Sequence, residues 1–256
     1  MPEILEFEEY GDGIGAAWMV LREHSNRAPR DAPVPTCPDW TMADLVAHQG
    51  TVHRWAAANL RGTPMDEVDT EAMEAEGLAA VDQGEWFDEG AKALLQALVD
   101  APDDLAATFF LVDAPPAKFA WARRQCHETS IHAVDAMSVS LGRAPLAAET
   151  WLSPRVAADG IDELLTGFVP RPHQKVRAEQ PCTVVVEATD VGRAWTMTIG
   201  PDPVVTTRER VADPDTVLSG TATQLYLGLW NRGDEFAVTG ADFLRLWRDR
   251  MTVRWA

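Results

Sequence analysis

The stretch RRQCHETSIHAVDA, Arg123 to Ala136, comes close to the helical zinc motif H-E-x-x-H, but one residue too many separates its two histidines. On a helix, residues four apart share a face, whereas residues five apart lie about 140° apart. His127 and His132 are five apart, so they cannot both reach one ion from an intact helix. Glu128 and His132 are four apart and can. The spacing excludes the metalloprotease motif and leaves a carboxylate–imidazole pair.

A third metal ligand has to come from another part of the chain. In the segment ADLVAHQGTVHRW, which begins at Ala43, His48 shares one helical face with apolar residues. We therefore expect His48 to face the interior, opposite Glu128 and His132, because helical bundles build metal centres from inward side chains on facing helices. His53 lies five residues after His48 and is expected to point elsewhere, into solvent.

The same residues also allow a plainer interpretation. His48 could be a core histidine, and Glu128 and His132 could form a helix-stabilising pair, since pairs at this spacing are common. Asp135, three residues after His132, could orient that imidazole or form a salt bridge at the helix end. Arg124, one turn before Glu128, is placed to pair with its carboxylate. Spacing alone favours the plainer interpretation.

Helical periodicity over the first 140 residues predicts a four-helix bundle. The first helix covers residues 7–21, the third residues 87–98, and the fourth residues 118–140. Thr41 and Asp44 form a capping box at the start of the second, directly after the proline-rich loop APVPTCPDW. The acidic stretch DEVDTEAMEAEG is expected to be a solvated loop or a short helix.

The second half of the chain has a different pattern, and the change falls in LGRAPLAAETWLS. A helix is predicted to begin at Ser153, and CTVVVEAT and RAWTMTIG to form a hairpin around DVG. DPVVTTRE and DTVLSG are predicted strands, followed by helices over residues 221–230 and 241–250. We therefore predict a two-domain α+β protein, with a helical bundle over residues 1–145 and a small α+β domain over residues 151–256.

Composition narrows the classes of partner. The 256 residues carry a net charge of −18, which repels phosphate backbones and argues against a nucleic-acid partner. No apolar run approaches the roughly 20 residues of a membrane helix, and the acidic N-terminus does not resemble a signal peptide. The chain has no C-x-x-C pair. Its three cysteines are expected to be small buried residues: Cys37, Cys126 and Cys182. We expect a cytoplasmic monomer or homodimer with no membrane partner.

Two segments carry a resemblance to a known family. VPTCPDWTMADLVAHQGTVHRWA and ARRQCHETSIHAVDA together resemble the mycothiol-dependent maleylpyruvate isomerase family of actinobacteria. The shared pattern is a C-P-x-W loop, a histidine on the second helix and H-E-x-x-x-H-x-x-D on the fourth. The resemblance covers almost the whole chain and implies a DinB-like four-helix bundle followed by a domain similar to sterol carrier protein 2. It also implies a divalent metal, zinc in the isomerase, held by His48, Glu128 and His132, which reverses the preference for the plainer interpretation.

The resemblance implies a thiol-dependent reaction. Two imidazoles and a carboxylate leave the fourth position of Zn²⁺, or another divalent metal, open, as in catalytic sites. Mycothiol would bind there, lose its proton and attack a small-molecule electrophile, in an isomerase or an S-transferase. TQLYLGLWNRGD resembles the isomerase segment that carries an arginine needed for activity, and the matching Arg232 could hold a substrate carboxylate. The surrounding sequence departs from the isomerase, so the substrate stays open.

Two other classes of function stay open at this point. A domain similar to a lipid-binding fold allows a small-molecule or lipid carrier with a structural metal site, although no long apolar tunnel is legible in the sequence. A zinc-dependent regulator, such as an anti-sigma factor, would use H-x3-C-x2-C ligands, and this chain has no such motif.

Overall fold

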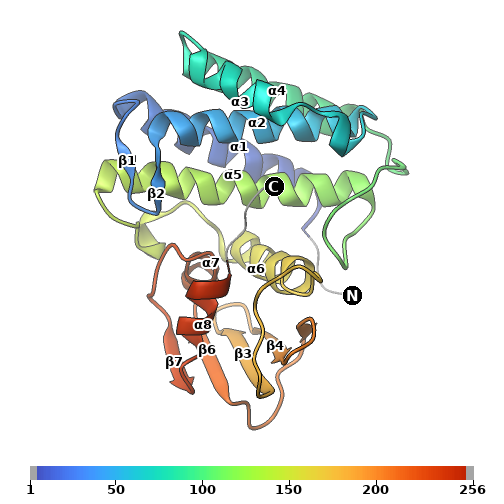
Figure 1. Cartoon of the computed structure of the whole chain (residues 1–256), viewed down its shortest axis with the longest axis vertical. Helices are drawn as coiled ribbons and strands as arrows, with labels where there is room; N and C mark the ends of the chain where they lie inside the picture. Colours follow the sequence, from blue (N-terminus) through green and yellow to red (C-terminus); the bar gives the residue numbers. More distant parts are fainter. Residues whose placement is uncertain (1–4, 252–256) are drawn as a thin grey trace. The chain divides into compact units, whose positions relative to one another are not determined.

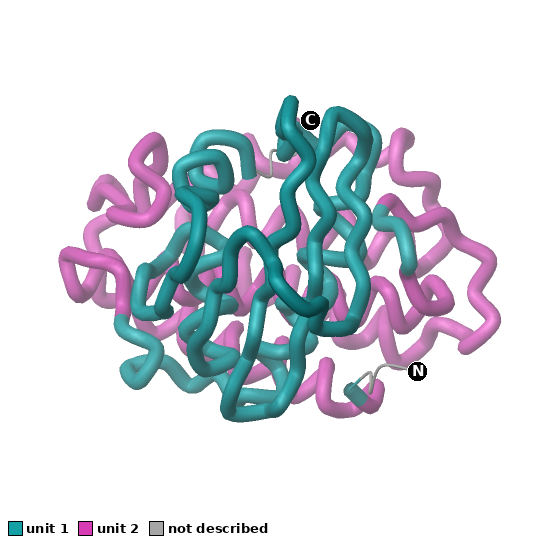
Figure 2. The backbone as a smooth tube through the Cα atoms, turned by 90° about the horizontal axis from the view of Figure 1, so that it is seen from below, with its two compact units in different colours: residues 1–5, 111–113, 146–256 teal, residues 6–110, 114–145 magenta. Residues whose placement is uncertain are grey.

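The computed structural model describes residues 5–251, which form two compact units (Figures 1 and 2). The helical unit contains residues 6–110 and 114–145, and the sheet unit contains Leu5, residues 111–113 and the described residues from 146 onward. This is the mixed α+β fold that the sequence predicts. None of the helices between residues 5 and 251 has the length and hydropathy to cross a membrane.

Four long helices form the body of the helical unit, and their arrangement can be followed in Figure 1. They are α1 (Phe7–Arg27), α2 (Met42–Leu60), α4 (Gln83–Asp100) and α5 (Ala117–Leu141). All four are predicted by the apolar periodicity of the sequence. Helix α5 is buried from Ala120 to Ser138 and packs against both α1 and α2, so it is the central helix of the unit. It ends at Gly142, whose φ of 67° is accessible to glycine at little cost.

Two smaller features connect these helices. The acidic stretch forms the short helix α3 (Thr70–Ala79), one of the two structures expected for it. The proline-rich loop forms an antiparallel hairpin of β1 (Pro33–Val34) and β2 (Cys37–Thr41). Strand β2 leads directly into α2, whose start is fixed by the predicted capping box: Thr41 Oγ1 accepts from the Asp44 backbone N–H, and Asp44 accepts in return.

The sheet unit is built on five strands in the order β5–β4–β3–β6–β7. They are β3 (Cys182–Ala188), β4 (Arg193–Ile199), β5 (Val205–Thr207), β6 (Thr216–Gly220) and β7 (Ala237–Gly240). The predicted hairpin β3–β4 is antiparallel, whereas β3 and β6 pair in parallel. Strand β7 is not predicted from the sequence, because its four residues show no alternation of apolar and polar side chains, and all four are exposed.

Three helices accompany the sheet: α6 (Pro154–Asp162), which continues into a π-helical segment (Glu163–Phe168), α7 (Ala222–Leu229) and α8 (Phe243–Arg250). Helix α6 begins where the sequence predicts, with the Ser153 side chain accepting from the Val156 backbone N–H. Helix α7 packs against α6 and against strands β3 and β6.

Candidate metal centre

Three metal-binding side chains converge inside the helical unit. His48 comes from α2, and Glu128 and His132 come from successive turns of α5. Glu128 Oε1 lies 3.5 Å from His48 Nε2 and 3.3 Å from His132 Nε2, and one ligand atom from each of the three residues lies within 4.8 Å of the others. All three residues are buried. The inward orientation expected from helical spacing is therefore present in the fold.

The atoms at the centre of this cluster fit a divalent cation. Among the described residues, His48 Nε2 and Glu128 Oε1 are buried atoms with no hydrogen-bond partner. A buried polar atom without a partner costs free energy that a bound ion would offset. Two imidazole nitrogens and one carboxylate oxygen are a ligand set that Zn²⁺ uses with a fourth position left open.

Neighbouring side chains contact two of the ligands through atoms other than those that converge. Arg124 Nη2 donates to Glu128 Oε2 at 3.0 Å, which leaves Oε1 facing the two histidines. Asp135 Oδ2 lies 2.9 Å from His132 Nδ1, so the carboxylate can accept that N–H and present Nε2 to a metal. Asp135 is fully buried, and its carboxylate contacts His132 rather than forming a solvent-exposed salt bridge at the helix end.

An aromatic side chain from the hairpin lies beside both histidines. The Trp40 ring centroid is 4.7 Å from that of His48 and 5.6 Å from that of His132, with the second pair stacked at 26°. Trp40 closes the C-P-x-W loop and is half-buried. The loop motif and the two helix motifs, which are far apart in the sequence, thus meet at one place.

Comparison with known proteins supports the resemblance seen in the sequence. A model described as the mycothiol maleylpyruvate isomerase N-terminal domain matches residues 13–137, and a model described as the MDMPI C-terminal domain matches residues 155–246. The chain belongs to the mycothiol maleylpyruvate isomerase family. Among curated proteins, none has a sequence that matches this chain.

Two solved structures from this family show the same fold. The crystal structure of a point mutant of the mycothiol-dependent maleylpyruvate isomerase matches with a TM-score of 0.64 at 13% identity, covering 92% of this chain and 93% of that one. The structure of the isomerase without the mutation matches with a TM-score of 0.62 at 14% identity and the same coverage. The predicted family and fold class are therefore confirmed.

One sequence prediction about α2 is wrong. His53 is fully buried, not solvated: its Nε2 lies 2.9 Å from Thr129 Oγ1 and 2.9 Å from Gln49 Nε2, and its ring stacks on Phe87. The reason is that α2 packs against α3, α4 and α5, so most of its circumference is buried. Burial lowers the pKa of His53 to about 3, which keeps this imidazole neutral.

The burial of the three cysteines agrees only in part with the expectation from the sequence. Cys126 is fully buried, as expected, whereas Cys37 and Cys182 are half-buried. Cys37 lies beside the cluster, with its Sγ 3.4 Å from Asp135 Oδ2. The structure thus brings a second residue of the C-P-x-W loop to the candidate metal centre, which helix spacing alone does not predict.

The pKa values of the ligands depend on one another. Burial raises the pKa of Glu128, but its contacts with His132 and His48 and the Arg124 guanidinium outweigh burial and hold that pKa well below its ordinary value. Burial lowers the pKa of His132, but the Asp135 and Glu128 carboxylates outweigh it and raise the pKa to about 9. Without a metal, His132 is therefore protonated at neutral pH.

We expect metal binding to release that proton. A ligating imidazole must be neutral at the coordinating nitrogen, so an ion competes with the proton on His132. The apparent affinity for Zn²⁺ should rise about tenfold per pH unit between about pH 7 and 9 and then level off. Calorimetric titration at pH 7.5, in buffers of different ionisation enthalpy, should give about one proton released per ion. Zinc binding without proton release would show that His132 is already neutral in the metal-free protein.

Arg232 belongs to the sheet unit, three residues after the end of α7. It is half-buried, and its Nη1 donates to the Trp230 carbonyl at 2.7 Å. The role that the family resemblance implies for it stays a prediction.

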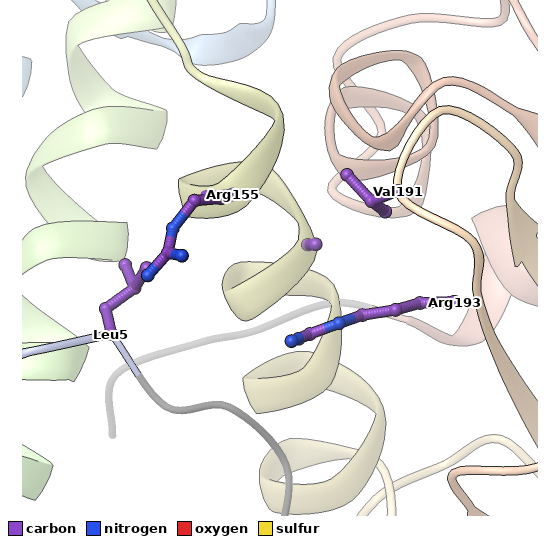
Figure 3. A pocket seen from close by; sticks show the side chains of 5 residues that line it. Leu5, Arg155, Val191 and Arg193 are labelled. Atoms are coloured by element: carbon purple, nitrogen blue, oxygen red, sulfur yellow. The ribbon is translucent and has the colours of Figure 1, made fainter.

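The sheet unit also contains a small cavity of about 240 Å³ (Figure 3). It lies between α6 and the start of β4 and is lined by Leu5, Arg155, Ala158, Val191 and Arg193. The cavity is lined by two guanidinium groups and is smaller than the roughly 300–1,000 Å³ of ordinary ligand pockets. It does not match the long apolar tunnel of a lipid carrier.

Proposed function

We propose that the chain is a metal-dependent enzyme that uses mycothiol to act on an electrophilic small molecule, as an isomerase or an S-transferase of its family. The observation that carries the proposal is the buried cluster of His48, Glu128 and His132, two of whose converging atoms have no other partner among the described residues. Membership of a family named for a mycothiol-dependent isomerase supports the choice of thiol.

The cluster and its neighbours have separate tasks. His48 Nε2, Glu128 Oε1 and His132 Nε2 would hold Zn²⁺ or another divalent metal, and Arg124 and Asp135 fix the orientation of two of these ligands. When bound, such a metal acts as a Lewis acid that lets a coordinated thiol lose its proton at neutral pH. The Trp40 ring packs against both imidazoles.

For Arg232, which belongs to the sheet unit, the proposal keeps the role that the family resemblance implies. A guanidinium binds a carboxylate through two parallel hydrogen bonds, so Arg232 is suited to hold an anionic electrophile.

A thiol-dependent enzyme of this kind is expected in the cytoplasm, where thiols are kept reduced.

One experiment separates the classes of function. Metal-loaded protein is incubated with mycothiol and a panel of electrophiles that includes maleylpyruvate, and the products are followed by mass spectrometry. A product of unchanged mass that forms only with mycothiol indicates an isomerase, and a stable thiol adduct indicates an S-transferase. Bound small molecules without any turnover would instead favour the carrier, the alternative that the sequence leaves open.

A further inference from the structure

The carboxylate of Asp135 is held from more than one direction. On one side, Oδ2 contacts His132 Nδ1 at 2.9 Å. On the other, Thr36 Oγ1 donates to Oδ1 at 2.6 Å, a distance typical of a hydroxyl bonded to an ionised carboxylate. The Cys37 thiol donates to Oδ2 at 3.4 Å. Two consecutive residues of the β1–β2 hairpin therefore donate hydrogen bonds to a side chain that lies about a hundred positions later in the chain.

The Thr36 hydroxyl is committed to this contact by its surroundings. Its oxygen also lies 3.1 Å from Ser138 Oγ. The Ser138 hydroxyl, however, donates to the Asp135 backbone carbonyl at 2.6 Å, so its single proton is not available to Thr36. An ionised carboxylate only accepts, so the single proton of Thr36 points along the shorter 2.6 Å contact to Asp135 Oδ1 rather than to Ser138 Oγ. This hydrogen bond fixes the plane of the carboxylate.

The orientation of that carboxylate decides which nitrogen His132 can offer. An imidazole that binds a metal through Nε2 carries its proton on Nδ1, and an acceptor at Nδ1 selects this tautomer and fixes the ring. With Oδ1 held by Thr36, Oδ2 stays opposite His132 Nδ1. His132 Nε2 then points to Glu128 Oε1, 3.3 Å away.

We propose that Thr36 is a positioning residue of the metal centre, which acts through Asp135 to hold His132 in its metal-binding orientation. The inference rests on the proposed function only in that the cluster binds a metal. It adds a residue from outside the two helix motifs and gives the hairpin a task beyond the contacts of Trp40.

The test measures the dissociation constant of Zn²⁺ by competition with a chromophoric chelator. Thr36→Val keeps the shape of the side chain and removes the donor, so we expect the affinity to fall about 10- to 100-fold, the usual effect of losing a group behind a metal ligand. Thr36→Ser keeps the hydroxyl and should restore affinity to within about threefold of the original protein. Thr150→Val, which removes a hydroxyl bonded to the Ala147 carbonyl in the sheet unit, is the matched control and should bind zinc normally.

A double-mutant cycle with Asp135→Asn distinguishes positioning from general loosening of the fold. If Thr36 acts through Asp135, Thr36→Val should have little further effect on zinc affinity once Asp135 is replaced. An equal loss of affinity in both backgrounds, or normal affinity in Thr36→Val, would overturn the inference while leaving the proposed function intact. If Thr36→Val does not fold, Thr36→Ser and Thr36→Ala are compared in the same two backgrounds. Failure of the original protein to bind zinc would overturn both proposals.

Discussion

His48→Ala is expected to abolish both metal retention and thiol-dependent turnover. His48 is the one ligand of the cluster that α2 supplies, and its Nε2 has no hydrogen-bond partner among the described residues. Its removal leaves two ligands, and we expect zinc affinity to fall at least roughly 1,000-fold, or about 4 kcal/mol. Metal content after dialysis, measured by mass spectrometry, and turnover with mycothiol should fall together.

The fold offers a matched control for this variant on the same helix. His53 is also a buried histidine of α2, but its Nε2 lies against Thr129 and Gln49. His53→Ala should lower the melting temperature, because it leaves buried polar groups without their partner, and should keep the metal. His48→Ala should instead lose the metal. Full thiol-dependent activity in His48→Ala would show that the enzyme proposal is wrong.

Arg232→Ala is expected to keep the metal and lose activity. If the guanidinium holds a substrate carboxylate, its removal leaves that charge unpaired, at a cost of about 2–5 kcal/mol in kcat/KM. Arg232→Lys should recover only part of the loss, because an ammonium group cannot form the paired hydrogen bonds of a guanidinium. Steady-state kinetics with an anionic electrophile, together with zinc content, measures both effects.

The control for Arg232 is another arginine of the sheet unit. Arg248 is exposed on α8, so Arg248→Ala changes the net charge by the same amount. Equal kcat/KM values for the Arg232 and Arg248 variants and the original protein would remove Arg232 from the reaction. The metal centre would be unaffected by that result, since none of its three ligands belongs to the sheet unit.

The local sequence pattern predicts the caps and the side-chain pairs within one helix. The start of α2 follows from Thr41 and Asp44, and the pairing of Glu128 with both Arg124 and His132 follows from their spacing of four. Such pairs depend only on helix geometry, so the sequence contains the information. The hairpin β3–β4 is predicted for the same reason, because its two strands are close in the chain.

Contacts between distant segments are not predicted in this way. Thr36 and Asp135 are 99 positions apart, and their hydrogen bond depends on where the hairpin packs. The burial of His53 depends on how many helices surround α2, which periodicity does not report. The parallel pairing of β3 with β6 likewise requires the whole sheet.

We propose that His48, Glu128 and His132 hold a metal with one position open to a thiol. Zinc K-edge X-ray absorption on the zinc-loaded protein, with and without mycothiol, tests it most directly. We expect only nitrogen and oxygen ligands at about 2.0–2.2 Å in the protein alone, and one added sulfur at about 2.3 Å with mycothiol. A spectrum that mycothiol leaves unchanged, or one that shows sulfur ligands before mycothiol is added, would contradict it.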